Sequence, residues 1–152
     1  MYNRILVPLD GSKLAESSLE HVKAIATGCQ VAEVILLAVV SGYRPGAGFS
    51  WGGVESEKQM AGMAEKAQAK ARSYLDSVGA KLAEKGMVVR TCVMIGSPAE
   101  TILNYVKDNN IDLIVIATHG RSGLSRWALG SVAEKVLTAS PVPVFIVSPK
   151  KR

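Results

Sequence analysis

The fold class is decided by the stretch Val34-Ile35-Leu36-Leu37-Ala38-Val39-Val40, an unbroken run of aliphatic side chains. A strand with one face in water alternates apolar and polar residues, and this stretch does not alternate. We therefore expect both of its faces to be buried, as they are inside a parallel sheet that helices cover on both sides.

Four further aliphatic runs accompany this stretch, and patterns of helical period separate them. The other strands are expected at residues 4–10, 88–95, 112–117 and 141–147. The helices are expected at residues 15–25, 57–85, 98–109 and 131–139. This alternation predicts a single α/β domain over residues 1–152, with βαβ units around a parallel sheet.

Local signals add detail to this pattern. Ser12 is a candidate N-cap, and Ser97-Pro98-Ala99-Glu100 predicts a helix start with a capping box. Gly79 is a candidate kink in the long helix, and residues 41–56 predict a long loop. Pro141 and Pro143 confine the last strand to an edge of the sheet.

The composition limits the class of protein. The chain has 152 residues, of which 48% are apolar and only 5% aromatic, so it can build one aliphatic core. No apolar run approaches the ~20 residues that span a bilayer, and the first residues lead into a strand rather than a signal peptide. We expect a cytoplasmic protein that does not associate with membranes.

The charges and the cysteines argue against several further classes. Of 18 basic residues, three form the tail at 150–152, which leaves an excess of two over the 13 acidic residues. Nucleic-acid binding is therefore not expected, since it favours a concentrated basic face with aromatic residues. Cys29 and Cys92 lie far apart, and no spacing of ligands predicts a metal site.

Three nucleotide or phosphate motifs are absent. The chain has no GxxxxGK[ST], and residues 46–52 miss GxGxxG by one position and open no helix. A receiver domain needs an aspartate after its third strand, and this chain has Val93-Met94-Ile95-Gly96 there. The search for a site therefore moves to the loops at the carboxyl ends of the strands, where open α/β sheets bind ligands.

Asp10-Gly11-Ser12 follows the first strand and allows two interpretations. The Asp10 carboxylate can accept hydrogen bonds from an amino group or hydroxyl of a ligand. It can equally form an Asx-turn that stabilises the corner between strand and helix. The residues alone leave both interpretations open.

The segment after the fourth strand, residues 117–131, carries glycines, two arginines and a helix start. Glycines let a backbone approach phosphate oxygens, and a helix N-terminus such as Gly130-Ser131 favours an anion. In the alternative interpretation the glycines only shape a loop, and Ser131-Val132-Ala133-Glu134 is a capping box. The spacing favours phosphate binding over this alternative.

These segments resemble the universal stress protein family. Ile5-Leu6-Val7-Pro8-Leu9-Asp10-Gly11-Ser12 is similar to the opening of its members, and residues 117–131 are similar to their ATP signature, G-x2-G-x9-G-[S/T]. The signature is matched by Gly120, by the nine residues after it and by Gly130-Ser131. Its first glycine is replaced by Ala117. The resemblance extends over essentially the whole chain.

The resemblance implies a five-stranded parallel sheet of order 3-2-1-4-5, of the type found in adenine-nucleotide α-hydrolases. It also implies bound ATP, with any Mg²⁺ or Mn²⁺ held mainly by the phosphates. Asp10 would contact the adenine or ribose, and the helix start would contact the phosphates. The residues so assigned are Pro8, Asp10, Val39, Ile116, Ala117, His119, Gly120, Arg121, Gly130, Ser131 and Val132.

By this resemblance the protein is a nucleotide-dependent module of the stress response, with at most slow ATP hydrolysis and no recognisable catalytic set. It would form a homodimer through Val142 to Val147, a run that is apolar on both faces at a sheet edge. One alternative is a nucleotide-free scaffold or chaperone-like dimer. Another is an adenylating or sulfur-transferring enzyme that uses Cys29 or Cys92 as a reactive thiol.

Overall fold

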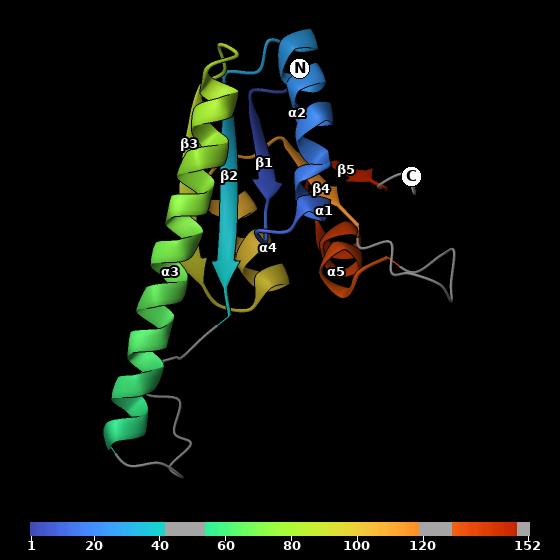
Figure 1. Cartoon of the computed structure of the whole chain (residues 1–152). Helices are drawn as coiled ribbons and strands as arrows, with labels where there is room; N and C mark the ends of the chain where they lie inside the picture. The colour runs from blue at the N-terminus through green and yellow to red at the C-terminus, as the bar shows by residue number, and fades with distance from the viewer. Residues whose placement is uncertain (42–53, 119–128, 149–152) are drawn as a thin grey trace.

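A five-stranded parallel sheet forms the centre of the computed structural model, which describes residues 1–41, 54–118 and 129–148 (Figure 1). The strand order is β3-β2-β1-β4-β5, which confirms the order 3-2-1-4-5. The strands are β1 Arg4–Pro8, β2 Glu33–Val40, β3 Val89–Ile95, β4 Leu113–Ala117 and β5 Val144–Val147. The predicted strands are all present, although β1 and β5 are shorter than expected.

Helices cover both faces of the sheet (Figure 1). The helices are α1 Lys13–Glu16, α2 Ser18–Gly28, α3 Val54–Ala83, α4 Pro98–Asp108 and α5 Ser131–Ala139. Buried residues of α1, α2 and α3 form one core with the sheet, and those of α4 and α5 form a second core on the opposite face. The molecule is thus a three-layer α/β structure.

Strand β2 shows why the deciding run does not alternate. Leu36 faces the core under α1, α2 and α3, whereas Ile35 and Leu37 face the core under α4 and α5. All three are at most 2% exposed. Each such side chain contributes roughly 1.5–3 kcal/mol when it leaves water, so a polar residue on either face would be costly.

The first predicted helix is divided into two. Ser12 caps α1 as predicted, since its Oγ accepts a hydrogen bond from the backbone N–H of Ala15 at 3.1 Å. At the division, the hydroxyls of Ser17 and Ser18 donate to the carbonyls of Leu14 and Ala15 at 2.6 and 2.7 Å. Such local side-chain bonds compete with the helical ladder, which the apolar spacing could not reveal.

Helix α3 continues through Gly79 to Ala83, so the candidate kink does not interrupt the helix. A Cβ at Gly79 would lie 3.2 Å from Cγ2 of Thr91, so this glycine allows α3 to pack closely on β3. The C-terminal half of α3 covers β2 and β3, while the N-terminal half, with exposed Met60 and Met63, extends past the sheet (Figure 1). No helix in the described ranges is both long and apolar enough to cross a bilayer.

The start of α4 is placed correctly, but its predicted capping box does not form. Ser97 is the N-cap residue and Pro98 begins the helix, yet no side-chain capping bond is made. Among the described strands, β3 pairs with β2 alone and β5 with β4 alone, so both lie at edges of the sheet. Both prolines precede β5, which begins at Val144 and leaves Val142 outside the strand.

Candidate functional site

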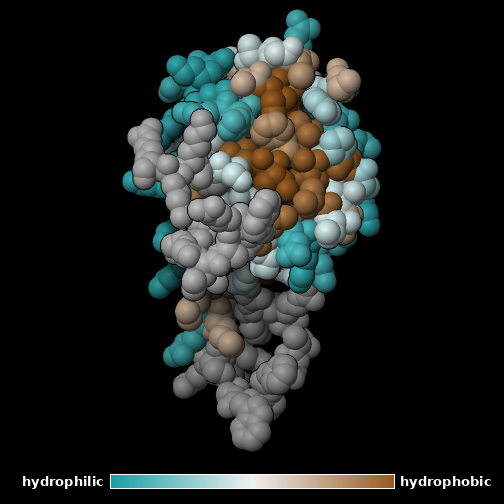
Figure 2. Space-filling model, turned by 90° about the vertical axis from the view of Figure 1, so that its right-hand side faces the viewer, coloured by the Kyte–Doolittle hydropathy of each residue, from teal (hydrophilic) through white to brown (hydrophobic). Residues whose placement is uncertain are grey.

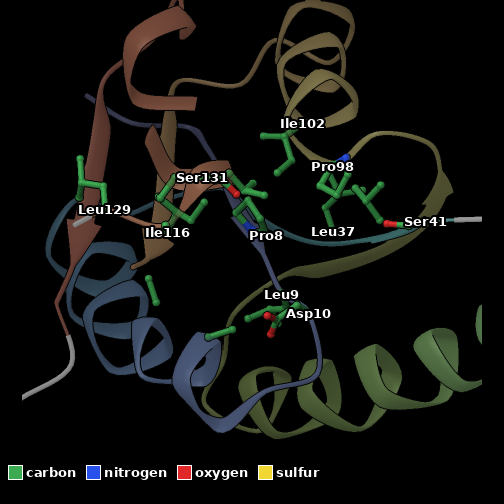
Figure 3. A pocket seen from close by; sticks show the side chains of 16 residues that line it. Pro8, Leu9, Asp10, Leu37, Ser41, Pro98, Ile102, Ile116, Leu129 and Ser131 are labelled. Carbon is green, nitrogen blue, oxygen red and sulfur yellow. The ribbon is translucent and has the colours of Figure 1, made fainter. Parts of the chain in front are cut away.

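A cavity of about 630 Å³ lies at the carboxyl ends of β1, β2 and β4, where α4 and α5 begin (Figure 3). This volume falls within the range of ordinary small-molecule sites. The lining residues are Pro8, Leu9, Asp10, Ala15, Leu37, Val39, Ser41, Pro98, Ile102, Ile116, Ala117, Leu129, Gly130, Ser131, Val132 and Ala133. The cavity thus occupies the crevice in which open α/β sheets bind ligands.

The structure brings together eight of the eleven residues that the sequence assigned to a site. They are Pro8, Asp10, Val39, Ile116, Ala117, Gly130, Ser131 and Val132. The other three, His119, Gly120 and Arg121, lie outside the described residues. The segments that carry these eight are distant in sequence, and the parallel strand order places their ends side by side.

Asp10 forms the predicted Asx-turn and also lines the cavity. Its Oδ1 accepts hydrogen bonds from the backbone N–H of Ser12 at 2.9 Å and from the Ser12 hydroxyl at 2.6 Å. Asp10 is nevertheless an exposed residue of the cavity lining (Figure 3). An ionised carboxylate accepts about four hydrogen bonds, so the two interpretations of this residue are compatible.

The N-terminus of α5 faces the cavity opposite this turn. Gly130 is its N-cap residue, with φ −59° and ψ 149°, and in the described part of the chain no side chain caps the helix. The predicted capping box is therefore wrong: the helix begins one residue earlier than the box requires, and Ser131 is its first residue rather than its cap. The amides of the first turn have no partner within the helix, and four residues of this turn line the cavity.

The lining between these two ends is mostly apolar. Pro8, Leu37, Val39 and Ile102 are among the side chains that surround this part of the cavity. The polar side chains of the described lining are limited to Asp10, Ser41 and Ser131. The cavity thus offers a carboxylate at one side, helix amides at the other and an apolar surface between them, which suits a planar base attached to an anion.

Half of the lining residues were not assigned from the sequence. They are Leu9, Ala15, Leu37, Ser41, Pro98, Ile102, Leu129 and Ala133. Ser41 was within reach of sequence reasoning, because it follows β2 at the carboxyl edge. Pro98 and Ile102 enter the cavity only because α4 packs across the end of β2, and no spacing in the sequence predicts that contact.

The side of the cavity near Asp10 is supported by helix α3. The hydroxyl of Tyr74 on α3 donates to Oε1 of Glu16 on α1 at 3.0 Å. Burial raises the pKa of the Tyr74 phenol, and the hydrogen bond to Glu16 and the negative charges of Glu16 and Asp10 raise that pKa further. Tyr74 therefore keeps its proton at neutral pH and acts as the donor.

Neither cysteine belongs to this site. Cys92 lies on β3 and packs against the core under α4 and α5, and Cys29 follows α2 as its C-cap residue. Both thiols are outside the described lining of the cavity. In the described part of the chain, no group of three His, Cys, Asp or Glu side chains is arranged to hold a metal ion.

The strand order and the crevice at its carboxyl edge define an α/β fold of the adenine-nucleotide α-hydrolase type. Within that class the chain belongs to the universal stress protein family, whose model matches residues 1–148.

Similar proteins cover the chain from end to end. Universal stress protein MJ0577 of Methanocaldococcus jannaschii is 32% identical over 161 residues, which span 99% of this chain and 97% of the relative. A solved structure of MJ0577 matches with a TM-score of 0.82 over 100% of this chain and 99% of that chain. Universal stress protein YxiE of Bacillus subtilis is 33% identical over 148 residues, or 97% of this chain and 99% of the relative.

The fold is also shared with a solved structure that contains a nucleotide. A universal stress protein family protein from Arabidopsis thaliana, solved with AMP bound, matches with a TM-score of 0.68. The match covers 97% of this chain and 92% of that chain at 18% identity, so it establishes likeness of fold.

Proposed function

We propose that this chain binds ATP in the cavity and acts as a nucleotide-dependent regulatory module of the stress response. The observation that carries the proposal is the N-terminus of α5, which faces the cavity across from Asp10 and has no side-chain cap among the described residues. Free amides and the helix dipole together favour a phosphate group at that position. Binding of AMP by a protein of the same fold supports an adenine nucleotide as the occupant.

The charges orient the nucleotide. The phosphates lie at Gly130, Ser131 and Val132, because the Asp10 carboxylate would repel them at the other side. Asp10 instead accepts hydrogen bonds from the ribose hydroxyls or the adenine amino group. The base lies against apolar residues such as Pro8 and Val39, which removes its faces from water.

The proposal assigns the protein a binding role rather than rapid catalysis. Fast phosphoryl transfer needs a carboxylate that holds the metal and a group that positions water. Asp10 is the carboxylate of the described lining, and it lies on the side away from the α5 terminus. Any Mg²⁺ or Mn²⁺ would therefore be held mainly by the phosphates, and hydrolysis would be slow.

The decisive experiment replaces Gly130 with valine and measures ATP affinity by calorimetry. The φ of −59° at Gly130 suits any residue, so the variant should fold normally while its side chain occupies the space of the phosphates. We expect at least a tenfold loss of affinity, roughly 1.4 kcal/mol. Gly28→Val is a matched control, since Gly28 is remote from the cavity lining and a Cβ there meets nothing within 4 Å.

Mass spectrometry of the denatured protein adds a direct test. ATP or AMP that co-purifies with the chain supports the proposal. Unchanged ATP affinity in folded Gly130→Val, or an absence of any adenine nucleotide binding in the wild-type protein, rejects it. The second result would favour the nucleotide-free scaffold, in which Ala117 has replaced a glycine that the nucleotide needs.

We further propose that two copies pair through the β5 edge. Phe145 is 40% exposed at this edge. Its half-buried neighbours are Val142, Val144 and Ile146. An apolar area covers this side of the molecule (Figure 2). Val147 is only 5% exposed within one chain, so it adds little to such an interface, contrary to the sequence-based expectation. Burial of an exposed edge against a second copy also satisfies its unpaired backbone groups.

Light scattering tests this assembly. Phe145→Asp should convert the dimer to a folded monomer, because it places two like charges near a two-fold axis. Val88→Asp is the control, since Val88 is 65% exposed and directly precedes β3 at the opposite edge of the sheet. A folded Phe145→Asp protein that remains dimeric would place the partner surface elsewhere.

A further inference from the structure

Helix α1 forms the wall of the cavity beside Asp10 and is too short to be stable alone. It spans four residues, Lys13–Glu16, and Ala15 from this helix lines the cavity. Isolated helices shorter than about 12 residues are marginal in water, so α1 depends on contacts with its surroundings. Its position therefore has to be set by other parts of the chain.

Two hydrogen-bonded contacts hold α1 at opposite ends. At its start, Ser12 caps the helix and donates to Asp10 through both its backbone N–H and its hydroxyl. At its end, Glu16 accepts the hydrogen bond from Tyr74, a residue 58 positions away in sequence. A rigid element therefore connects the Tyr74 contact to the Asp10 turn.

Tyr74 is well placed to fix this element. Its helix α3 packs on β2 and β3, while α1 packs against β4, so the hydroxyl bridges two parts of the same layer. The ring of Tyr74 packs against the core that includes Ala15 and Leu75, which holds the donor in place. In Figure 3, α1 and α3 run beside the labelled Asp10 on one side of the pocket.

We propose that Tyr74 is a positioning residue, which holds α1 through Glu16 and thereby keeps Asp10 in the geometry that receives the nucleotide. This inference rests on the proposed function. It assigns to α3 a part in ligand binding although the side chains of α3 are absent from the described lining of the cavity.

Three substitutions separate the hydroxyl contact from packing and charge. Tyr74→Phe removes the hydroxyl and keeps the ring, and Glu16→Ala removes the acceptor. Both should weaken ATP binding by roughly fivefold, the effect of one net hydrogen bond. Glu16→Gln keeps an oxygen that accepts from Tyr74 and should bind ATP within about twofold of the wild-type protein, which separates the hydrogen bond from the charge of Glu16. Tyr74→Phe keeps the packed ring, so its loss of affinity is the result that a role in packing alone does not predict.

Amide hydrogen exchange without nucleotide gives a second, independent readout. The backbone N–H groups of Ala15, Glu16 and Ser17 bond within this turn, to Ser12 and Leu14. In Tyr74→Phe and Glu16→Ala they should exchange several-fold faster. The N–H of Cys29, which bonds to Ile25 at the end of α2, should keep its wild-type rate.

Tyr105→Phe controls for the general loss of a phenol hydroxyl. Tyr105 lies on α4 in the opposite core and is only 8% exposed, so its variant should match the wild-type protein in ATP affinity and in exchange of α1. If the wild-type protein binds ATP and Tyr74→Phe binds it equally well, the inference is wrong. If the wild-type protein does not bind ATP, the proposed function fails. The positioning role is tested separately: it is wrong if the amides of α1 exchange at the same rate in Tyr74→Phe as in the wild-type protein.

Discussion

Helices α1, α4 and α5 begin at the rim of the cavity, and the N-termini of α1 and α5 differ in their capping. Helix α1 is capped by its own Ser12, whose Oγ accepts from the amide of Ala15. Helix α5 starts after Gly130, which has no side chain to offer, and its first turn faces the cavity. Within the described residues a side chain caps α1 and none caps α5, and our proposal assigns the amides of α5 to a phosphate group.

The largest expected effect comes from a charge at the uncapped terminus. Ser131→Asp places a carboxylate at the first position of α5, where it stabilises the helix dipole by about 0.3–1 kcal/mol and repels phosphate. We expect a protein with an equal or higher melting temperature that has lost measurable ATP binding, as followed by thermal denaturation and calorimetry. A variant that keeps its ATP affinity would show that the phosphates do not contact α5.

Asp10 tests the opposite side of the cavity. Asp10→Ala should reduce ATP affinity by roughly 1–3 kcal/mol, the effect of losing a hydrogen bond to a charged acceptor, and should weaken the preference for ATP over GTP. Asp10→Asn retains an oxygen that can accept from Ser12, so it serves as a control for the turn. A loss of thermal stability without any change in affinity would mean that Asp10 has only the structural role.

Ser12 distinguishes a cap from a ligand contact. Ser12→Ala removes the cap of α1 and one of the two bonds to Asp10, and it should lower the free energy of unfolding by about 1 kcal/mol. ATP affinity should fall less than in Asp10→Ala, because the carboxylate itself remains. Urea denaturation and calorimetry measure the two effects, and an affinity loss larger than that of Asp10→Ala would contradict this order.

Some parts of this contrast were accessible from the sequence and others were not. The aliphatic run of β2 predicts its burial because both faces of a parallel strand contact helices, and that prediction is confirmed. The sequences from Ser97 to Glu100 and from Ser131 to Glu134 both predict a capping box, and neither box forms. At α5 a shift of one residue in the helix start makes Gly130 the cap, whereas at α4 Ser97 is the cap residue but its side chain makes no capping bond.

The roles of Tyr74 and Ile102 illustrate the remaining limit. Both lie on predicted helices at apolar positions, and nothing in the helical period shows that one reaches α1 and the other the cavity. Contacts of this kind depend on the packing of α3 and α4 across the sheet. Residues that follow the strands were easier to assign, because the parallel order brings all strand ends to one edge.

Alkaline pH tests the contact that supports the α1 side. Burial raises the pKa of Tyr74 above its usual value of 10.0. The hydrogen bond to Glu16 and the negative charges of Glu16 and Asp10 raise this pKa further. The contribution of this phenol to stability is thus fully present below pH 10 and is lost as the pH rises further. The free energy of unfolding should fall less steeply above pH 10 in Tyr74→Phe than in the wild-type protein, and equal slopes in urea titrations would contradict this.

The smallest expected effect concerns Ala117, which stands at the first glycine position of the signature and lines the cavity beside Ile116. Ala117 is half-buried at the end of β4, where it pairs with Val147 in an ordinary strand register. The strand geometry does not require a glycine, so Ala117→Gly should lower stability by roughly 0.5–1 kcal/mol through backbone entropy. Removing a methyl group from the wall should leave ATP affinity equal or slightly higher, within about threefold, as measured by calorimetry. A marked loss of affinity would show that this methyl group contacts the nucleotide favourably, and the alanine would then be a feature that adapts this cavity to its ligand.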